Sequence, residues 1–224
     1  MNYENSVNKV KLTGVAASGI RFSHELYGEK FHEFDLAVAR LSGAEDILPV
    51  TASERLLMRF PVRTGETLSI FGQFRSYNKL SDGKSKLILT VFAQEIFPEP
   101  HETLHNNFIE LTGYVCKTPI YRTTPFNREI CDVLLAVNRS YGKSDYIPAI
   151  AWGRNARFMK FLPVGKQIAV CGRVQSRIYQ KRLENETVEK RTAYEVSIGK
   201  IQVGADFDAM NDAAGAPRYT LSAT

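Results

Sequence analysis

The stretch Asn8-Lys9-Val10-Lys11-Leu12-Thr13-Gly14 returns 99 residues later as Asn107-Phe108-Ile109-Glu110-Leu111-Thr112-Gly113. Other landmarks keep this spacing. Residues 36–40 (LAVAR) return as 135–139 (LAVNR), and Leu48-Pro49 returns as Ile147-Pro148. Gly65 and Gly72 return at a spacing of 100, as Gly165 and Gly172. A register held over about 60 residues indicates a duplicated domain, because solenoid repeats have periods of about 20–50 residues.

Two units of about 100 residues fit the 224-residue chain, and each is long enough to bury a small core. We expect the first domain at residues 1–98 and the second at 107–203. Residues 99–106 are polar, contain proline and have no periodicity, which predicts a linker. Residues 204–224 are rich in Ala, Gly, Asp and Ser, and are expected to form a disordered tail.

Apolar residues in each unit alternate with polar ones or form short continuous runs, as is typical of β-strands. In the second unit five strands are predicted, at 108–115, 131–137, 147–152, 168–174 and 194–201. Residues 155–162 have helical spacing and are followed by Pro163 and Gly165; residues 53–60 are their counterpart. Three strands, one short helix and two strands is the order of the five-stranded Greek-key barrel, the OB-fold. The sequence therefore predicts an all-β protein with short helices, made of two tandem OB-fold domains.

Composition favours a soluble globular protein, with 44% hydrophobic and 24% charged residues. No apolar run approaches the roughly 20 residues needed to span a bilayer, and the N-terminus lacks the regions of a signal peptide. We therefore expect a cytoplasmic protein with no membrane partner. Cys116, Cys131 and Cys171 are an odd number without close pairing and are interpreted as reduced core thiols.

The net charge of +5 is spread unevenly along the chain. Residues 1–104 carry a net charge of −1, whereas residues 105–203 carry +8. A basic domain beside a neutral copy of itself suggests a polyanion partner for the basic one. The alternative interpretation is that the positive charge serves only to keep the protein soluble. The charge by itself does not distinguish this from a polyanion partner.

One short motif suggests an enzyme. Residues 101–105 (HETLH) match the zinc-protease pattern of two His four residues apart with Glu as general base. They follow two prolines in the expected linker, and no third ligand is recognisable, so the linker interpretation is favoured. The sequence also has no Gly-rich phosphate loop and no recognisable Ser/His/Asp set. We expect no catalysis, no metal and no cofactor, and keep a metalloprotease as the least favoured alternative.

Aromatic and basic residues are interleaved on the strands and loops of the second unit. Tyr146 and Trp152 are six residues apart and therefore share one strand face. Such a surface suits single-stranded nucleic acid, whose bases each gain about 1–3 kcal/mol by stacking on an aromatic ring. A place in the barrel core is an equally good interpretation for any single aromatic. The predicted stacking residues are Tyr141, Tyr146, Trp152 and Tyr179, and the predicted phosphate-binding residues are Arg139, Arg154, Arg173, Arg177, Lys181 and Arg182.

Residues 107–203 resemble the bacterial-type single-stranded DNA-binding protein (SSB) family. The resemblance rests on 107–113, 117–123 (KTPIYRT), 135–139, 150–156 (IAWGRNA), 162–166 (LPVGK) and 172–177 (GRVQSR). It implies an OB-fold, sequence-tolerant binding of single-stranded DNA without catalysis, and assemblies that present four OB domains. A homodimer of this two-domain chain would supply four. The resemblance also implies that Tyr141, Tyr146, Trp152 and Tyr179 stack bases, and that Arg122, Arg154 and Arg177 contact phosphates.

The first unit resembles the family only weakly. At the positions matching the stacking aromatics it has Ser42, Ile47, Ser53 and Lys79, and Phe74 and Tyr77 are near but out of register. We therefore expect a first domain that is structural, or specialised for pairing and partner contacts, with little DNA affinity. The tail ends Leu-Ser-Ala-Thr rather than in the acidic, hydrophobic tip through which the family usually recruits partners, so recruitment through this tail is left open.

Two functional interpretations follow. The first is a nucleoid-associated protein that coats single-stranded DNA in replication, recombination or repair, mainly through the second domain, with replication or repair proteins as further partners. The second is a primosome-like interaction or scaffold protein whose duplicated barrels bind DNA weakly. The loss of aromatics in the first unit keeps the second interpretation open.

Overall fold

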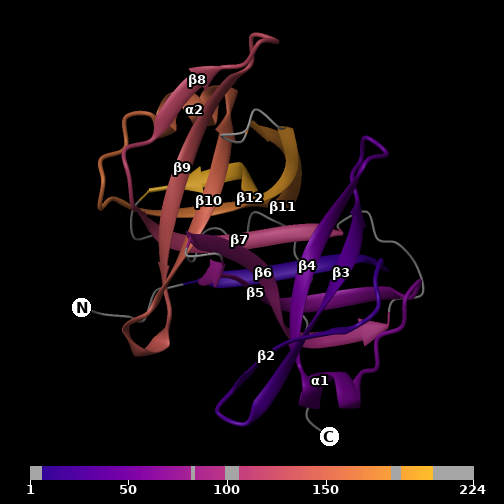
Figure 1. The fold of residues 1–224 in the computed structure, drawn as a ribbon. Coiled ribbons are helices and arrows are strands. Elements are labelled where there is room, and N and C mark those ends of the chain that lie inside the picture. Colours follow the sequence, from indigo (N-terminus) through magenta and orange to yellow (C-terminus); the bar gives the residue numbers. More distant parts are fainter. Residues whose placement is uncertain (1–6, 82–83, 99–105, 183–187, 204–224) are drawn as a thin grey trace, which may run out of the picture.

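The computed structural model describes residues 7–81, 84–98, 106–182 and 188–203, in which strands predominate. Two barrels lie one above the other in Figure 1, with the two short helices at opposite outer ends. The strand β6 ends at Pro98 and β7 begins at Asn107. The predicted linker is outside the described residues except for Asn106, and so are the HETLH motif and the tail.

The N-terminal barrel is closed because β1 pairs with both β3 and β5, while β4 and β6 pair in parallel. The short strand β2 pairs with β3 beside the barrel. The elements are β1 (Asn8–Ala16), β2 (Arg21–Leu26), β3 (Glu29–Ala39), β4 (Glu45–Ser53), α1 (Glu54–Arg59), β5 (Thr67–Ser81) and β6 (Lys84–Pro98).

The C-terminal barrel repeats this arrangement, with β7 paired to both β9 and β11, and β10 parallel to β12. Its elements are β7 (Asn107–Val115), β8 (Ile120–Thr123), β9 (Glu129–Asn138), η2 (Ser140–Gly142), β10 (Ser144–Trp152), α2 (Gly153–Met159), β11 (Gln167–Arg182) and β12 (Val188–Gln202). Apart from the short elements β8 and η2, the order of strands and helix is the predicted one, and the prediction of two tandem OB-folds is confirmed.

Three details differ from the sequence prediction. The strands predicted at 168–174 and 194–201 form a longer hairpin, because cross-strand pairing continues through charged residues as far as Arg182 and Val188. The short strands β2 and β8 were missed, since their mostly exposed residues lack a buried face. The helix α2 begins at Gly153, two residues before the expected N-cap Asn155.

The core of each barrel is formed by the inward residues of its strands. Leu12, Phe34 and Ile70 are fully buried in the first barrel, as are Leu111 and Val170 in the second. Burying a side chain of this size stabilises a fold by about 1.5–3 kcal/mol. Phe74, which lies near a stacking position in sequence, is also fully buried.

The cysteines only partly fit the expected core positions. Cys131 is buried, but Cys116 and Cys171 are half-buried, and all three are free thiols. Burial raises the pKa of the Cys131 and Cys171 thiols to about 11. In the part of the chain that the structure describes, no helix is long and apolar enough to cross a membrane.

The glycine that ends each repeated opening stretch lies where two strands of a barrel come closest. A Cβ atom on Gly14 would lie 2.2 Å from the carbonyl oxygen of Ala37, and one on Gly113 would lie 2.8 Å from that of Ala136. These separations are shorter than van der Waals contact, so only glycine lets β1 meet β3 and β7 meet β9. The repeat therefore preserves the residues that close the barrels.

The two barrels are joined by antiparallel pairing of β1 with β7. Val10 lies opposite Ile109, its own counterpart in the repeat, and Asn8 lies opposite Leu111. The pairing is therefore self-complementary, like the interface of a twofold-symmetric dimer.

A second contact, which we call the interdomain clasp, occurs twice. Arg40 Nη2 donates to the carbonyl oxygen of Ser176 at 2.8 Å, and the Ser176 N–H donates to Asp46 Oδ1 at 2.6 Å. In the repeat-related copy, Arg139 Nη2 donates to the Ser76 carbonyl oxygen at 2.8 Å, and the Ser76 N–H donates to Asp145 Oδ1 at 2.5 Å. Each Arg also pairs with the Asp of its own domain. Both Asp side chains are 1% exposed and both Arg side chains are 27% exposed, so each clasp holds a buried carboxylate against a partly buried guanidinium.

We predict that Asp145→Ala lowers the free energy of unfolding by about 3 kcal/mol or more, because it leaves Arg139 and the Ser76 N–H without their buried partner. Urea unfolding followed by circular dichroism measures this. The matched control, Glu29→Ala, removes an exposed ion pair with Arg55 and should cost less than about 1 kcal/mol. An equal loss of unfolding free energy in the two variants would contradict the prediction that the clasp stabilises the fold more than an exposed ion pair does.

Candidate nucleic-acid interface

A groove of about 590 Å³ lies on the C-terminal barrel where β8, β9, β10, β11 and β12 meet. We call it the Trp152 groove. Its lining includes Trp152, Ile130, Ile150, Gln175, Ser197 and the arginines Arg122, Arg128, Arg173 and Arg177, together with Arg40 from the N-terminal barrel. Trp152, Arg122, Arg173 and Arg177, all expected to bind single-stranded DNA, are thus brought together.

Trp152 is the last residue of β10. The next residue, Gly153, has a φ of 51°, which favours glycine and turns the chain into α2. The indole Nε1 donates to Ser197 Oγ at 3.3 Å, which fixes one edge of the ring. The side chain is 39% exposed, so part of its surface remains accessible to a ligand.

Arg173 and Arg177 are exposed on β11, whereas Val174 between them is buried in the core. Arg177 Nε lies 3.6 Å from Glu195 Oε1, and Gln175 Nε2 donates to the same oxygen at 2.8 Å. Glu195 therefore orients this part of the groove. Its single charge is outweighed by the surrounding arginines, so the groove favours an anion.

Arg122 reaches the groove from β8. Its Nε donates to Asp132 Oδ2 at 2.7 Å, and this hydrogen bond raises the pKa of the guanidinium above its usual value. Arg122 thus stays charged, and its half-exposed side chain retains donors for a further anion.

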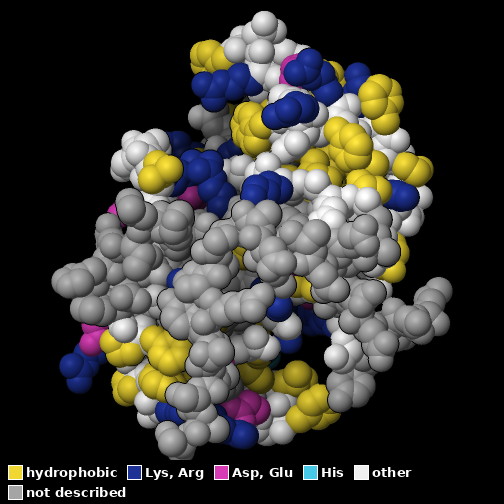
Figure 2. All heavy atoms as spheres, turned by 180° about the vertical axis from the view of Figure 1, so that it is seen from behind, with side chains coloured by type: hydrophobic (Ala, Val, Ile, Leu, Met, Phe, Trp, Pro, Cys, Tyr) yellow, Lys and Arg dark blue, Asp and Glu magenta, His cyan; other side chains and the backbone are white. Residues whose placement is uncertain are grey.

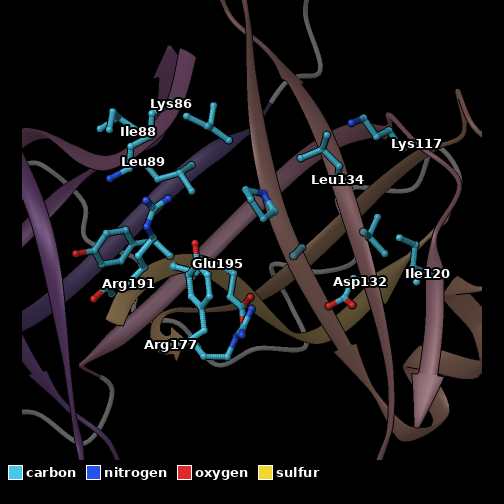
Figure 3. Close-up of a pocket in the computed structure, with 18 of the residues that line it drawn as sticks. Lys86, Ile88, Leu89, Lys117, Ile120, Asp132, Leu134, Arg177, Arg191 and Glu195 are labelled. Atoms are coloured by element: carbon cyan, nitrogen blue, oxygen red, sulfur yellow. The ribbon is translucent and has the colours of Figure 1, made fainter. Parts of the chain in front are cut away.

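The Trp152 groove continues into a second cavity, of about 630 Å³, which we call the interdomain groove (Figure 3). Arg177 and Glu195 line both. Tyr179 lies beyond Arg177, whose guanidinium carbon is 5.7 Å from the centre of the tyrosine ring. The other basic residues of this lining are Lys117 and Arg191 from the C-terminal barrel and Lys86 from β6 of the N-terminal barrel.

Several predicted residues lie elsewhere. Tyr146 is 44% exposed, but it lines neither groove, and neither does the exposed Arg154 on α2. Arg139 belongs to the interdomain clasp, where its donors are used within the protein. Tyr141 lies in η2, and Lys181 and Arg182 end β11, but their side chains are outside the described part of the structure.

Sequence reasoning missed Arg128 and Lys86 as groove residues. Arg128 lies in the turn between β8 and β9, where there is no periodicity to place it. Lys86 belongs to the other repeat, and only the packing of the two barrels brings it to the interdomain groove. Seen from behind in Figure 2, Lys and Arg side chains interleave with hydrophobic ones over the upper, C-terminal part of the molecule.

Residues 106–203 match the single-strand binding protein family. The Single-stranded DNA-binding protein 1 of Staphylococcus aureus (strain COL) is 34% identical over 83 residues, which are 34% of this chain and 50% of that protein. The chain thus spans about half the length of the curated relatives it matches.

The two-barrel fold has a counterpart among solved structures. A deletion variant of the single-stranded DNA binding protein from Thermus aquaticus superposes with a TM-score of 0.68 at 20% identity, covering 90% of this chain and 96% of that one. The N-terminal domain of PriB protein from Thermoanaerobacter tencongensis is 47% identical, covering 42% of this chain and 98% of that one, with a TM-score of 0.37. The resemblance expected from the second repeat is therefore confirmed: residues 106–203 of this two-OB-domain chain are similar to the single-strand binding protein family.

Proposed function

We propose that this protein binds single-stranded DNA without sequence preference, mainly through its C-terminal barrel, in DNA replication, recombination or repair. The observation that carries the proposal is a half-exposed tryptophan set among arginines in one groove. The family match over the same residues supports it.

The two kinds of side chain have different tasks. Trp152 and Tyr179 offer ring surfaces on which any base can stack, because every base has a π-face. The arginines attract the phosphates and release counterions, which makes the affinity fall as salt rises. The run from the Trp152 groove into the interdomain groove gives one strand a path along the barrel.

A primosome-like interaction protein is the second candidate. It is favoured by the N-terminal barrel, which has Ser53 where the C-terminal barrel has Trp152. Titration with oligo-dT, followed through Trp152 as the chain's single tryptophan, separates the two. Strong quenching of the Trp152 fluorescence, with an affinity that falls steeply as salt rises, supports DNA binding. Weak binding that is indifferent to both Trp152→Ala and Tyr179→Ala favours the interaction protein.

We predict that Trp152→Ala weakens binding of fluorescently labelled oligo-dT by about 5- to 150-fold, which corresponds to the loss of one stacked base. Fluorescence anisotropy at fixed salt measures it. The matched control is Phe161→Ala, which removes an exposed aromatic after α2, outside the groove, and should leave affinity unchanged.

We predict that Arg128→Gln lowers the slope of log affinity against log salt by about 0.7–1, because one phosphate contact is lost. Titrations at several salt concentrations give the slope. Arg157→Gln is the matched control, since Arg157 is an exposed arginine on α2 that pairs with Glu129 outside the groove lining. An equal change in both variants would show that only overall charge matters.

We further propose that two chains associate and so present four OB domains, as the resemblance implies. Light scattering at micromolar concentration should give twice the mass of 25.2 kDa. A monomer under these conditions would contradict the four-barrel assembly. It would not contradict DNA binding by a single chain, which the oligo-dT titrations test separately.

A further inference from the structure

The helix α2 and the turn after it expose large apolar side chains at the outer end of the C-terminal barrel (Figure 1). Phe158 is 47% exposed, Phe161 76% and Val164 56%. Large apolar side chains that are exposed together commonly mark a contact with another macromolecule. We call the surface formed by Arg157, Phe158, Lys160, Phe161, Val164 and Lys166 the α2 patch.

The two phenylalanines are neighbours because the chain turns tightly where α2 ends. The Phe161 N–H donates to the carbonyl oxygen of Phe158 at 3.3 Å, and the Leu162 N–H donates to that of Met159 at 3.0 Å. Side chains three residues apart lie next to each other in such a turn. Met159 is fully buried, so the core anchors the turn while its outer side carries both rings.

The α2 patch is positively charged. Residues 157–166 contain Arg157, Lys160 and Lys166, all three exposed, and no acidic residue. Glu129 of β9 approaches from the side: its Oε2 lies 3.3 Å from Arg157 Nε, and its Oε1 accepts the hydroxyl of Tyr121. The charge of Glu129 is therefore spent on Arg157, and the two lysines can attract an anion from outside.

The corresponding end of the N-terminal barrel has a different surface. Residues 58–66 carry Arg59 and Arg63, but also Glu66. Phe60 is half-buried there, and the guanidinium carbon of Arg59 lies 5.1 Å from the centre of its ring. The OB-fold can thus be built without such a patch, so the fold alone does not account for the exposed rings of α2.

The rings of the α2 patch are poorly placed for stacking on bases. Lys160 Nζ lies 4.7 Å from the centre of the Phe161 ring and 4.8 Å from that of Tyr121, so it covers part of both. No residue of the patch lines the Trp152 groove or the interdomain groove, along which a phosphate backbone could run. An apolar centre with a polar rim is instead typical of a contact between proteins.

We propose that the α2 patch binds an acidic segment of another protein, in which Asp or Glu alternate with large apolar side chains. The apolar side chains pack on the exposed rings, and the carboxylates pair with Lys160 and Lys166. Because Trp152 directly precedes α2, the bound protein lies beside the Trp152 groove. This site goes beyond the proposed function and does not depend on it.

The test measures binding of a short fluorescein-labelled synthetic peptide, in which Asp and Glu alternate with Phe and Leu, to the full chain by fluorescence anisotropy. We expect Phe158→Ala combined with Phe161→Ala to weaken binding about tenfold or more, because two apolar anchors are lost. Lys160→Gln combined with Lys166→Gln should also weaken it and reduce its dependence on salt. A peptide with Lys in place of every Asp and Glu should not bind.

Met58→Ala is the matched control, because Met58 is an equally exposed apolar residue (74%) on α1. It should leave the peptide affinity unchanged. Thermal unfolding of each variant checks the fold. If the alanine variant unfolds at a lower temperature, the lysine variant, which keeps both rings, decides the question.

Failure of the acidic peptide to bind, or equal affinity in the patch variants and the unsubstituted chain, would overturn the proposal. A loss of oligo-dT affinity in the alanine variant would also overturn it, by assigning the α2 patch to DNA. So would tighter peptide binding by the chain with Asp206→Asn and Asp208→Asn, since its own acidic segment would then be the occupant. Failure of the proposed function looks different: oligo-dT would not quench Trp152, while peptide binding would follow the pattern expected here.

Discussion

Antiparallel backbone pairing between β1 and β7 holds the two barrels together, and residues of both barrels line the interdomain groove. Val10 lies opposite its own counterpart Ile109, so the barrels are related by an approximate twofold axis. A contact that one barrel makes with the other is therefore repeated in the opposite direction. The two clasps obey this symmetry, since each barrel's buried aspartate accepts a backbone N–H of the other. Lys86 of the first barrel and Arg177 of the second line the same interdomain groove.

Much of the fold could be predicted because the same signals occur twice. Apolar alternation marks the five strands of each barrel, and the repeated landmarks mark two copies of one domain. The structure adds that one of these landmarks, Gly14, lies at a close crossing of two strands. The long β11–β12 hairpin could not be bounded from sequence, since its outer part is polar and held by cross-strand hydrogen bonds. The strands β2 and β8 were not predicted for a similar reason. They are edge strands whose residues are mostly exposed, so their sequences lack an alternation of apolar and polar residues.

The candidate site was predicted in part. Trp152, Arg122, Arg173 and Arg177 do share one groove, because neighbouring strands place their outward residues side by side. Arg139 shows the limit of such reasoning, since a strand-end arginine looks free in sequence but is bound to a buried aspartate. Other neighbours cannot be predicted because they are distant in sequence. Phe22, Phe31, Tyr77 and Phe92 come from different strands of the N-terminal barrel and line one groove, but no local sequence pattern predicts that they meet.

The β1–β7 pairing also has a consequence for how the two halves can diverge. Two separate copies of one barrel would have to keep identical sequences and would part on dilution. Here residues of the interface belong to one covalent chain, so the partner's effective concentration does not depend on how much protein is present. Each half can then mutate on its own while the other is unchanged. One barrel has a groove lined by a tryptophan among arginines, and the other has a groove lined by a cluster of phenylalanines. A fused chain can carry such a difference between its halves, whereas a symmetric dimer of identical chains cannot.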